Sequence, residues 1–284
     1  MATGSQAPEE LLSHDWLGAC RRAADGLRTV LREHPTSTQR VIETGERGEG
    51  GDLTLVIDAA AEDAVFSELD RLHRDGARFT AVSEERGLVA FGDPDVLVVI
   101  DPIDGSLNAK RGLTHHALSI AVSQGPTMAD VVFGYVFDLG PGEEWRATRG
   151  EGAYLDGERL DPPLERRNKD GLLEVVAIES ADPRWLARSS QELCNVTGRI
   201  RAIGSIAVSM CQLAATRVDG MATLWRCRAV DVAASQLIVR ESGGLVAFTG
   251  MDDPLGAPLD LEPHSPVVAA RTPEALAELA TLSP

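Results

Sequence analysis

Apolar residues recur every three or four positions near the start of the chain and gather into short runs further along it. Residues 9–34 predict one amphipathic helix, and residues 52–73 lead into a second. The glycine-rich, highly charged segment 42–51 between them is typical of a mobile loop. Short apolar runs at 79–85 and 95–105 predict strands, and the runs that follow continue this pattern. We therefore expect a middle region of mostly antiparallel strands.

Beyond this middle region, short apolar runs alternate with longer helical segments. Residues 230–244 predict a helix closed by two glycines, and a final helix is expected with Thr272 as its N-cap and Pro273 in its first turn. Helices layered against sheets in this order indicate a mixed α/β (α+β) fold. We expect two tightly joined halves, an N-terminal α+β half (1–170) and a C-terminal α/β half (171–284).

The balance of charge narrows the classes of partner. The 284 residues include 44 Asp and Glu against 27 Lys and Arg, which gives a formal net charge of −17. Such a surface repels nucleic acid and anionic lipid, and neither is expected as a partner. No run approaches the ~18 apolar residues that cross a bilayer, and no secretion signal is recognised at the N-terminus. Four cysteines without C-x-x-C spacing fit a reducing compartment, so a cytoplasmic protein is expected.

The segment VVIDPIDGSLN, residues 98–108, carries the strongest chemical signal. An apolar strand is expected to bring Asp101 to its end, where Pro102 stops the ladder and Asp104 follows. Two acids so close repel each other unless a cation lies between them, and hard oxygen ligands favour Mg²⁺, Mn²⁺ or Ca²⁺. Gly105 allows a turn into a short helix, whose first N–H groups suit a phosphate. An ordinary polar β-turn explains the same motif about equally well.

Two further groups of acids lie at the ends of predicted elements. Glu84 and Glu85 end the strand predicted at 79–85, and Asp231 begins an apolar helix. Each has an ordinary explanation, because paired glutamates are commonly solvated and an acid at a helix N-terminus interacts favourably with the helix dipole. Three acid-bearing ends in one chain can, however, converge on one metal site.

These segments resemble the inositol monophosphatase family of lithium-sensitive, metal-dependent phosphatases. The family's DPxDGT-x-N signature is similar to DPIDGSLN here, its GEE element to SEE, and its WD-x-AA-G element to VDVAASQLIVRESGG. The order and spacing of these segments also match, from about residue 10 onward. The resemblance implies a layered α-β-α-β-α sandwich of the inositol monophosphatase/fructose-1,6-bisphosphatase type, assembled as a homodimer.

The resemblance also implies a set of metal ligands. Glu84, Asp101 and the carbonyl of Ile103 would hold a first Mg²⁺. Asp101, Asp104 and Asp231 would hold a second one, and Mn²⁺ is an alternative metal. Cations a few Å apart can lower the pKa of a water and neutralise charge on the attacking and leaving oxygens, so no covalent phosphoenzyme is needed.

Catalytic roles follow from the same resemblance. Asp58 matches the acid that helps to hold a further, weaker metal. Phosphate would rest on the backbone N–H groups of Gly105 and Ser106. Glu84 and the hydroxyl of Ser106 would orient the attacking water for in-line displacement, so most of the catalysis would be positioning and electrostatics.

Fewer residues bear on the substrate. The IGSIA segment resembles a sugar-contacting turn, which implies that Gly204 and Ser205 contact the substrate. Leu224 stands where inositol-selective members carry a glutamate. The surrounding segment is more similar to archaeal-type members that act on both inositol phosphates and fructose-1,6-bisphosphate. Arg226 or Arg228 would meet a second phosphate, or else balance nearby acids at the surface.

The sequence therefore predicts a Mg²⁺-dependent phosphatase acting on a small phosphate ester: inositol monophosphate, fructose-1,6-bisphosphate or both. The first alternative is the same chemistry on histidinol phosphate or 3′-phosphoadenosine 5′-phosphate. The four tryptophans show no stacking pattern typical of nucleobase binding. The net acidic surface and the absence of an obvious base-stacking aromatic near the motifs weigh mildly against the nucleotide. The second alternative is a non-catalytic regulatory dimer, in which a lost metal ligand is expected, whereas the acids of the signature are all present.

Overall fold

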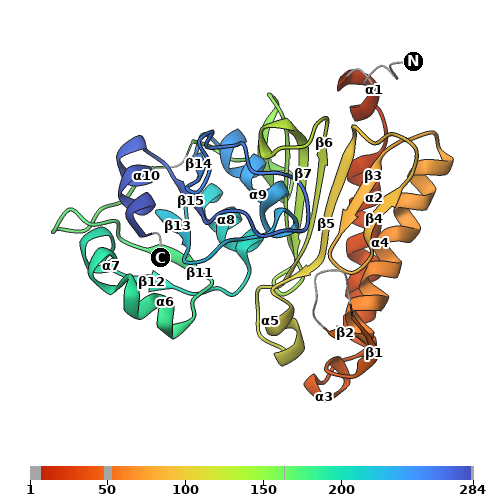
Figure 1. Ribbon diagram of the computed structural model, residues 1–284, viewed down its shortest axis with the longest axis horizontal. Coiled ribbons are helices and arrows are strands. Elements are labelled where there is room, and N and C mark those ends of the chain that lie inside the picture. Colours follow the sequence, from red (N-terminus) through yellow and green to blue (C-terminus); the bar gives the residue numbers. More distant parts are fainter. Residues whose placement is uncertain (1–7, 48–52, 163, 283–284) are drawn as a thin grey trace.

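Five layers make up the molecule in the computed structural model, which describes residues 8–47, 53–162 and 164–282. From right to left in Figure 1 they are a pair of helices, a large sheet, a second pair of helices, a smaller sheet and an outer group of helices. Strand β6 (Ala117–Ser123) and helix α9 (Ala229–Glu241) are buried along almost their whole length, because layers cover them on both sides. The predicted α-β-α-β-α sandwich is confirmed.

The large sheet has eight strands in the order β10-β9-β8-β7-β6-β5-β3-β4. Its pairs are antiparallel except for β3 and β5, which run parallel. Short connections favour this meander, since antiparallel neighbours need only a turn between them. The strands besides β6 are β3 (Thr80–Ser83), β4 (Gly87–Ala90), β5 (Leu97–Asp104), β7 (Val131–Asp138), β8 (Glu143–Thr148), β9 (Gly152–Leu155) and β10 (Glu158–Arg159).

The smaller sheet has five strands in the order β12-β11-β13-β15-β14. Strand β11 runs parallel to both β12 and β13, and β15 is antiparallel to its two neighbours. Parallel pairs require crossover connections, and helix α8 lies in the one that carries the chain from β12, on one side of β11, to β13 on the other. The elements are β11 (Val176–Glu179), β12 (Ile200–Arg201), α8 (Ile206–Ala214), β13 (Gly220–Thr223), β14 (Leu245–Phe248) and β15 (Val267–Ala270).

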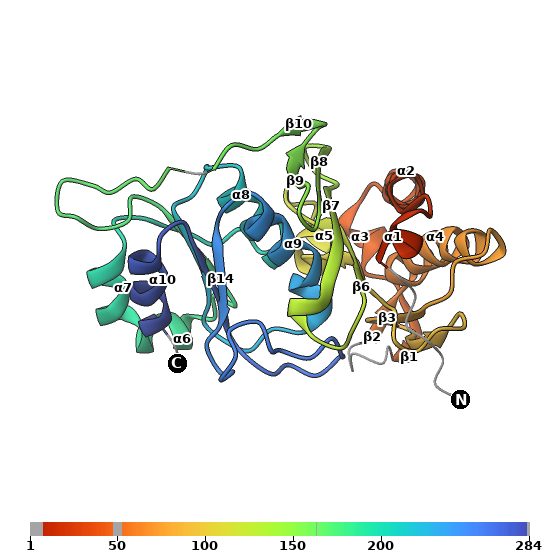
Figure 2. The same ribbon diagram turned by 90° about the horizontal axis from the view of Figure 1, so that it is seen from above.

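Helices cover the outer face of each sheet, as Figure 2 shows from above. On the large sheet these are α2 (Trp16–Glu33) and α4 (Val56–Arg74), which pack against each other. On the smaller sheet they are α6 (Pro183–Arg188), α7 (Ser190–Val196) and α10 (Pro273–Leu279). The predicted start of the last helix is confirmed, since Thr272 caps α10 by accepting a hydrogen bond from the Ala275 N–H.

One apolar cluster joins the two parts of the chain. It combines Val99 and Val136 of the large sheet with Met221 of the smaller sheet and Leu237 of α9. The expected boundary near residue 170 falls between the strands of the two sheets. Because the central helices contact both sheets, the two parts share a core.

Two predictions in the first part of the chain need correction, one of a helix and one of a loop. The single helix predicted at 9–34 is interrupted: α1 (Pro8–Leu12) ends early, and Asp15 then caps α2 by accepting from the Gly18 N–H. A side chain that caps a new helix also allows the chain to change direction before it. The segment 42–51 is not a plain loop, because it contains β1 (Glu43–Arg47), which pairs with β2 (Leu53–Leu55). Residues 48–51 of this segment lie outside the described residues.

The strand that carries the main motif is also longer than predicted. Pro102 does not end the ladder, because β5 continues to Asp104. The pairing with β6 shifts register between Asp101 and Asp104, so the proline falls within an irregular step of the ladder. Within the described residues, no helix is both long and apolar enough to cross a membrane.

Candidate functional site

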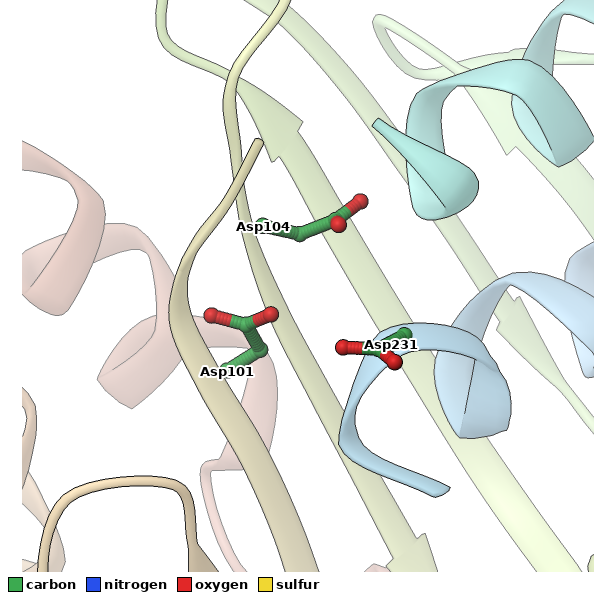
Figure 3. Close-up of side chains that lie close together, drawn as sticks. All are labelled: Asp101, Asp104 and Asp231. Atoms are coloured by element: carbon green, nitrogen blue, oxygen red, sulfur yellow. The ribbon is translucent and has the colours of Figure 1, made fainter. Parts of the chain in front are cut away.

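Three aspartates from two elements meet at the boundary between the large sheet and the central helices. Asp101 and Asp104 lie on β5, and Asp231 lies in the first turn of α9 (Figure 3). One carboxylate oxygen from each lies within 4.8 Å of the others. All three residues are buried. The sequence prediction that these acids converge is confirmed.

The backbone around Asp101 and Asp104 explains how the two carboxylates reach the same place. The register shift turns the strand between them, and the Ile103 N–H donates to Oδ1 of Asp101 at 2.9 Å. Gly105 follows with φ +86°, and a Cβ there would lie 2.8 Å from the carbonyl oxygen of Gly204. A glycine is therefore required by both conformation and space. Helix α5 (Ser106–Arg111) starts immediately afterwards, as predicted.

Asp104 is held by the second half of the chain. Its Oδ2 accepts hydrogen bonds from the Ser205 hydroxyl at 2.5 Å and from the Ala207 N–H at 2.7 Å. Burial and the nearby Asp231 raise the pKa of Asp104 to about 8, although these two hydrogen bonds oppose the shift. Ser205 is buried and also caps α8 by accepting from the Val208 N–H. The Ser205 hydroxyl thus both orients Asp104 and caps α8, and its contact with substrate stays a prediction.

Glu84 joins the aspartates through Arg228. One guanidinium group donates to Oε1 of Glu84 at 2.6 Å and to Oδ1 of Asp231 at 3.0 Å. Burial raises the pKa of Glu84 against the effect of Arg228, and burial together with Glu84 and Asp104 raises the pKa of Asp101 well above its usual range. Arg228 was predicted to bind substrate; here it is committed to two carboxylates, and its role toward substrate stays a prediction.

This donor set fits a hard divalent cation. The four acids carry more negative charge than the single guanidinium of Arg228 can offset. Burial and the neighbouring acids raise the pKa values of Glu84, Asp101 and Asp104. Buried like charges are costly unless a cation compensates them. The donors are carboxylate oxygens, which suit Mg²⁺ or Mn²⁺ rather than zinc or copper. The described residues therefore form a site that can hold a metal.

A cavity beside the aspartates gathers most of the remaining predicted residues. Its lining consists of Asp58, Glu84, Glu85, Asp101, Pro102, Ile103, Ser106 and Lys110. Asp58 comes from the first turn of α4, where it is buried, and Ser106 from the first turn of α5. The structure thus places the predicted catalytic residues around one space.

The sequence reasoning missed Lys110 in this cavity. Lys110 lies four residues after Ser106 on α5, so both side chains fall on one face of the helix. It is half-buried and makes no hydrogen bond or ion pair with any residue that the structure describes. A cation in a cavity otherwise lined by acids is suited to a phosphate oxygen. The four-residue spacing in the sequence was the available signal.

A second, wider hollow of about 330 Å³ lies beside Asp104 and Asp231. Asp104 and Asp231 line it together with Gly204 and Ile206. Gly204 thus lines an open space beside the aspartates, and its contact with substrate stays a prediction. Leu224, in contrast, is fully buried in the outer apolar cluster.

Two buried glutamates brace the loops of the site, and the sequence reasoning identified neither. Glu62 accepts hydrogen bonds from the Ser83 hydroxyl and from the Arg86 N–H, on either side of Glu84. Glu179, at the end of β11, accepts from the N–H groups of residues 203 and 204 at 2.9 and 3.0 Å. A lone glutamate in a sequence is usually read as solvated, so neither carried a signal.

Two of the four tryptophans stack on each other. The rings of Trp185 and Trp225 stack at 4.7 Å between centroids and 12° between planes. Trp225 is 44% exposed and lies three positions before Arg228. Each ring thus has the other as its stacking partner, and the prediction that the tryptophans show no pattern typical of nucleobase binding stays a prediction.

The fold and the carboxylate site together define the class of metal-dependent phosphatases built as a five-layer sandwich. The sequence model of the inositol monophosphatase family matches residues 13–283, and the chain belongs to that family. It is a phosphatase of this superfamily.

Named relatives agree with this placement. The chain is 28% identical over 249 residues to a fructose-1,6-bisphosphatase/inositol-1-monophosphatase of Methanothermobacter thermautotrophicus, covering 84% of this chain and 86% of that protein. It is 33% identical over 246 residues to Nus factor SuhB of Escherichia coli, with the same coverage. The crystal structure of the MJ0109 gene product, an inositol monophosphatase–fructose 1,6-bisphosphatase, superposes with a TM-score of 0.79 at 24% identity, covering 94% and 99% of the two chains. The last comparison supports the fold.

Proposed function

We propose that this phosphatase uses Mg²⁺ to hydrolyse a phosphate monoester of a small polyol or sugar. The observation that carries the proposal is the convergence of three buried aspartates beside a cavity that also contains Ser106 and Lys110. The phosphatase from M. thermautotrophicus, whose name includes both inositol-1-monophosphate and fructose-1,6-bisphosphate activities, supports these two substrates as first candidates.

The phosphate group would lie against the start of α5. The first N–H groups of a helix have no partner within it, and those of Gly105 and Ser106 suit phosphoryl oxygens. Lys110 adds a point charge one turn further along the helix. Together they would fix the phosphorus for in-line attack.

The attacking water would be oriented by two groups that line the same cavity. Glu84 and Ser106 both line this space. The carboxylate of Glu84 can accept a proton from the water, and the hydroxyl of Ser106 can position the water by a hydrogen bond. Asp101, Asp104 and Asp231 would hold the cations, with Glu84 and the Ile103 carbonyl completing the set. When bound, the cations would favour loss of a proton from the water and offset charge on the phosphoryl oxygens.

The leaving group would occupy the hollow lined by Gly204 and Ile206. No Lys or Arg belongs to the described lining of that hollow, and Glu179 adds an acid to it. A second phosphate would lack a partner there, whereas the hydroxyls of a polyol could bond to backbone and carboxylate oxygens. This charge pattern favours inositol monophosphate over fructose-1,6-bisphosphate.

The direct test is phosphate release by the purified protein. Both substrates would be compared with and without Mg²⁺, with a chelator, and with Asp101→Asn as the matched control. We expect metal-dependent turnover with a higher kcat/KM for inositol 1-phosphate. A higher kcat/KM for fructose-1,6-bisphosphate would contradict the preference inferred from the charges that line the hollow. If neither substrate is hydrolysed, histidinol phosphate and nucleotide phosphates would be tested next.

A regulatory function is the second candidate. Nus factor SuhB of Escherichia coli is 33% identical to this chain over 246 residues, which supports a role of that kind beside or instead of catalysis. The acidic residues argue for retained catalysis, because a purely regulatory protein has no need for them. An Asp101→Asn variant that restores every phenotype of a deletion strain would favour the regulatory function.

A further inference from the structure

A hollow of about 470 Å³ lies away from the aspartates, between the C-terminal end of α2 and the loops that follow α5 and β7. We call it the arginine groove, because Arg28, Arg32 and Arg40 line it. His116 also faces it, and none of the described residues that line it is Asp or Glu. In a chain with a net charge of −17, a hollow with this charge pattern is unusual.

The arginines of the groove are poorly compensated. Among the residues that the structure describes, Arg32 bonds only to groups of its own helix, the Arg28 carbonyl and the Thr29 hydroxyl. Arg28 lies 3.5 Å from Asp25, and both side chains are more than half exposed, so the pair is weak. Arg21 of the same helix, in contrast, forms a two-pronged ion pair with Glu144.

Arg40 is fixed by carbonyl groups rather than by an acid. Its guanidinium donates to the carbonyl oxygens of His34 and Ala109, each at 2.7 Å, and to that of Leu31 at 3.3 Å. It forms no ion pair with a described residue. Basic residues do favour the carbonyl end of a helix such as α2. That effect explains Arg32 in the last turn, but it explains neither Arg40 of α3 (Ser37–Arg40) nor the hollow between them.

We propose that the arginine groove binds a small organic phosphate, at a site distinct from the carboxylate site. Guanidinium groups match the oxygens of phosphate, and a space of a few hundred Å³ suits a small metabolite. Leu31, Leu113 and Leu139 line the same hollow and offer apolar contact to a short carbon skeleton. The ligand is thus a phosphate ester with a skeleton of a few carbons.

The groove is linked to the carboxylate site through one short helix. The carbonyl that Arg40 holds, that of Ala109, belongs to α5, which also carries Ser106 and Lys110. A ligand that binds the Arg40 guanidinium therefore competes with the hydrogen bond between Arg40 and the Ala109 carbonyl. It would thereby affect α5, the helix proposed to bind the substrate phosphate. This consequence rests on the proposed function, and by linkage each ligand would change the affinity of the other.

Binding can be measured without turnover. Protein freed of divalent metal with a chelator would be titrated with inorganic phosphate and with glycerol 3-phosphate, using calorimetry and ³¹P NMR. The test variant is R28A/R32A, because both side chains are exposed and leave the core intact. Arg184→Ala, an exposed arginine on α6, is the matched control, and Lys110→Ala removes the cation of the other site.

We expect R28A/R32A to weaken glycerol 3-phosphate binding at least tenfold, with wild-type affinity in R184A and K110A. Equal affinity in R28A/R32A and wild type would overturn the proposal. Loss of all binding in K110A would also overturn it, because the phosphate would then lie at the carboxylate site. Citrate binding as tightly as glycerol 3-phosphate would refute the assignment to a phosphate. None of these readouts depends on catalysis, so failure of the proposed function would leave the test valid.

Discussion

Ser205 donates its hydroxyl hydrogen to Asp104, a residue 101 positions earlier in the chain. Asp104 ends β5 of the large sheet, whereas Ser205 begins α8 beside the smaller one. The Ala207 N–H adds a second bond to the same oxygen. A candidate metal ligand from the first half of the chain is therefore oriented by the second half, and the site is complete only when the two sheets are packed together.

We predict that Ser205→Ala weakens both the fold and the response to metal. Loss of the helix cap should lower the free energy of unfolding by about 1 kcal/mol, and the loss of a bond to a buried carboxylate by about as much again. The Mg²⁺ concentration for half-maximal phosphate release should rise roughly tenfold or more, because Asp104 is less well oriented. Urea unfolding and a Mg²⁺ titration measure the two effects.

Thr272→Ala is the matched control, since Thr272 caps α10 in the same way but lies in the outer layer. It should cost about 1 kcal/mol of stability and leave the Mg²⁺ titration unchanged. If the two variants have the same Mg²⁺ response, Ser205 acts as a helix cap alone.

We predict that Asp101→Asn separates activity from stability. Burial and the neighbouring acids raise the pKa of Asp101, so in metal-free protein its ionised form is disfavoured. Asparagine keeps the oxygen that accepts from the Ile103 N–H but removes the charge. Turnover should fall by at least about a hundredfold, whereas the Tm without metal should stay the same or rise. A Tm lowered in step with activity would assign Asp101 a structural role.

Lys110→Ala should impair substrate binding more than folding. A charge-assisted hydrogen bond contributes about 1.5–3 kcal/mol, so kcat/KM should fall roughly tenfold to a hundredfold. Inhibition by the product, inorganic phosphate, should weaken as well, and Lys110→Arg should recover part of both. Arg111→Ala is the matched control, because the next residue on α5 is exposed and lies outside the cavity lining. Equal losses in K110A and R111A would exclude a specific contact.

The sequence predicted the layers and the convergence of the three aspartates because the motifs that carry them are local. Asp101 and Asp104 stand in one short motif, and Asp231 begins a helix whose apolar residues are recognisable. The register shift within β5 was missed, since a proline usually ends a ladder and here it lies inside an irregular step. The break before α2 was missed as well, because Asp15 acts as a cap only in the folded geometry.

The residues that support the site left no local signal. Glu62 lies on a helix among other charged residues, and only the packing of α4 against β3 brings it to the Ser83 hydroxyl. Glu179 and the turn that it braces are 24 positions apart. The stack of Trp185 on Trp225 joins residues 40 positions apart, from α6 and from the segment after β13. Such contacts follow from tertiary structure, which periodicity does not encode.

Glu62 should make the stability of the metal-free protein depend on pH. Burial raises its pKa from 4.5 to about 7, against the opposing effects of Ser83 and Arg86. The folded state therefore keeps a proton between about pH 4.5 and pH 7 that the unfolded state has lost. In this window the unfolded state binds fewer protons, so stability falls as pH rises. The loss attributable to Glu62 is on the order of 3 kcal/mol.

Urea unfolding of wild type and Glu62→Gln across pH 5 to 8 checks this prediction. The variant should lose less stability on going to pH 8, because glutamine cannot ionise in the buried position. Glu144→Gln is the control of opposite sign: burial tends to raise the pKa of Glu144, but the hydrogen bond from Arg21 outweighs it and the pKa is lowered. Its contribution is lost only as pH falls below its usual range, so its difference from wild type should stay constant between pH 5 and pH 8. Parallel stability curves for wild type and E62Q would mean that Glu62 is ionised in the folded protein, and that the segment carrying Glu84 is held by an ion pair with Arg86 rather than by a protonated acid.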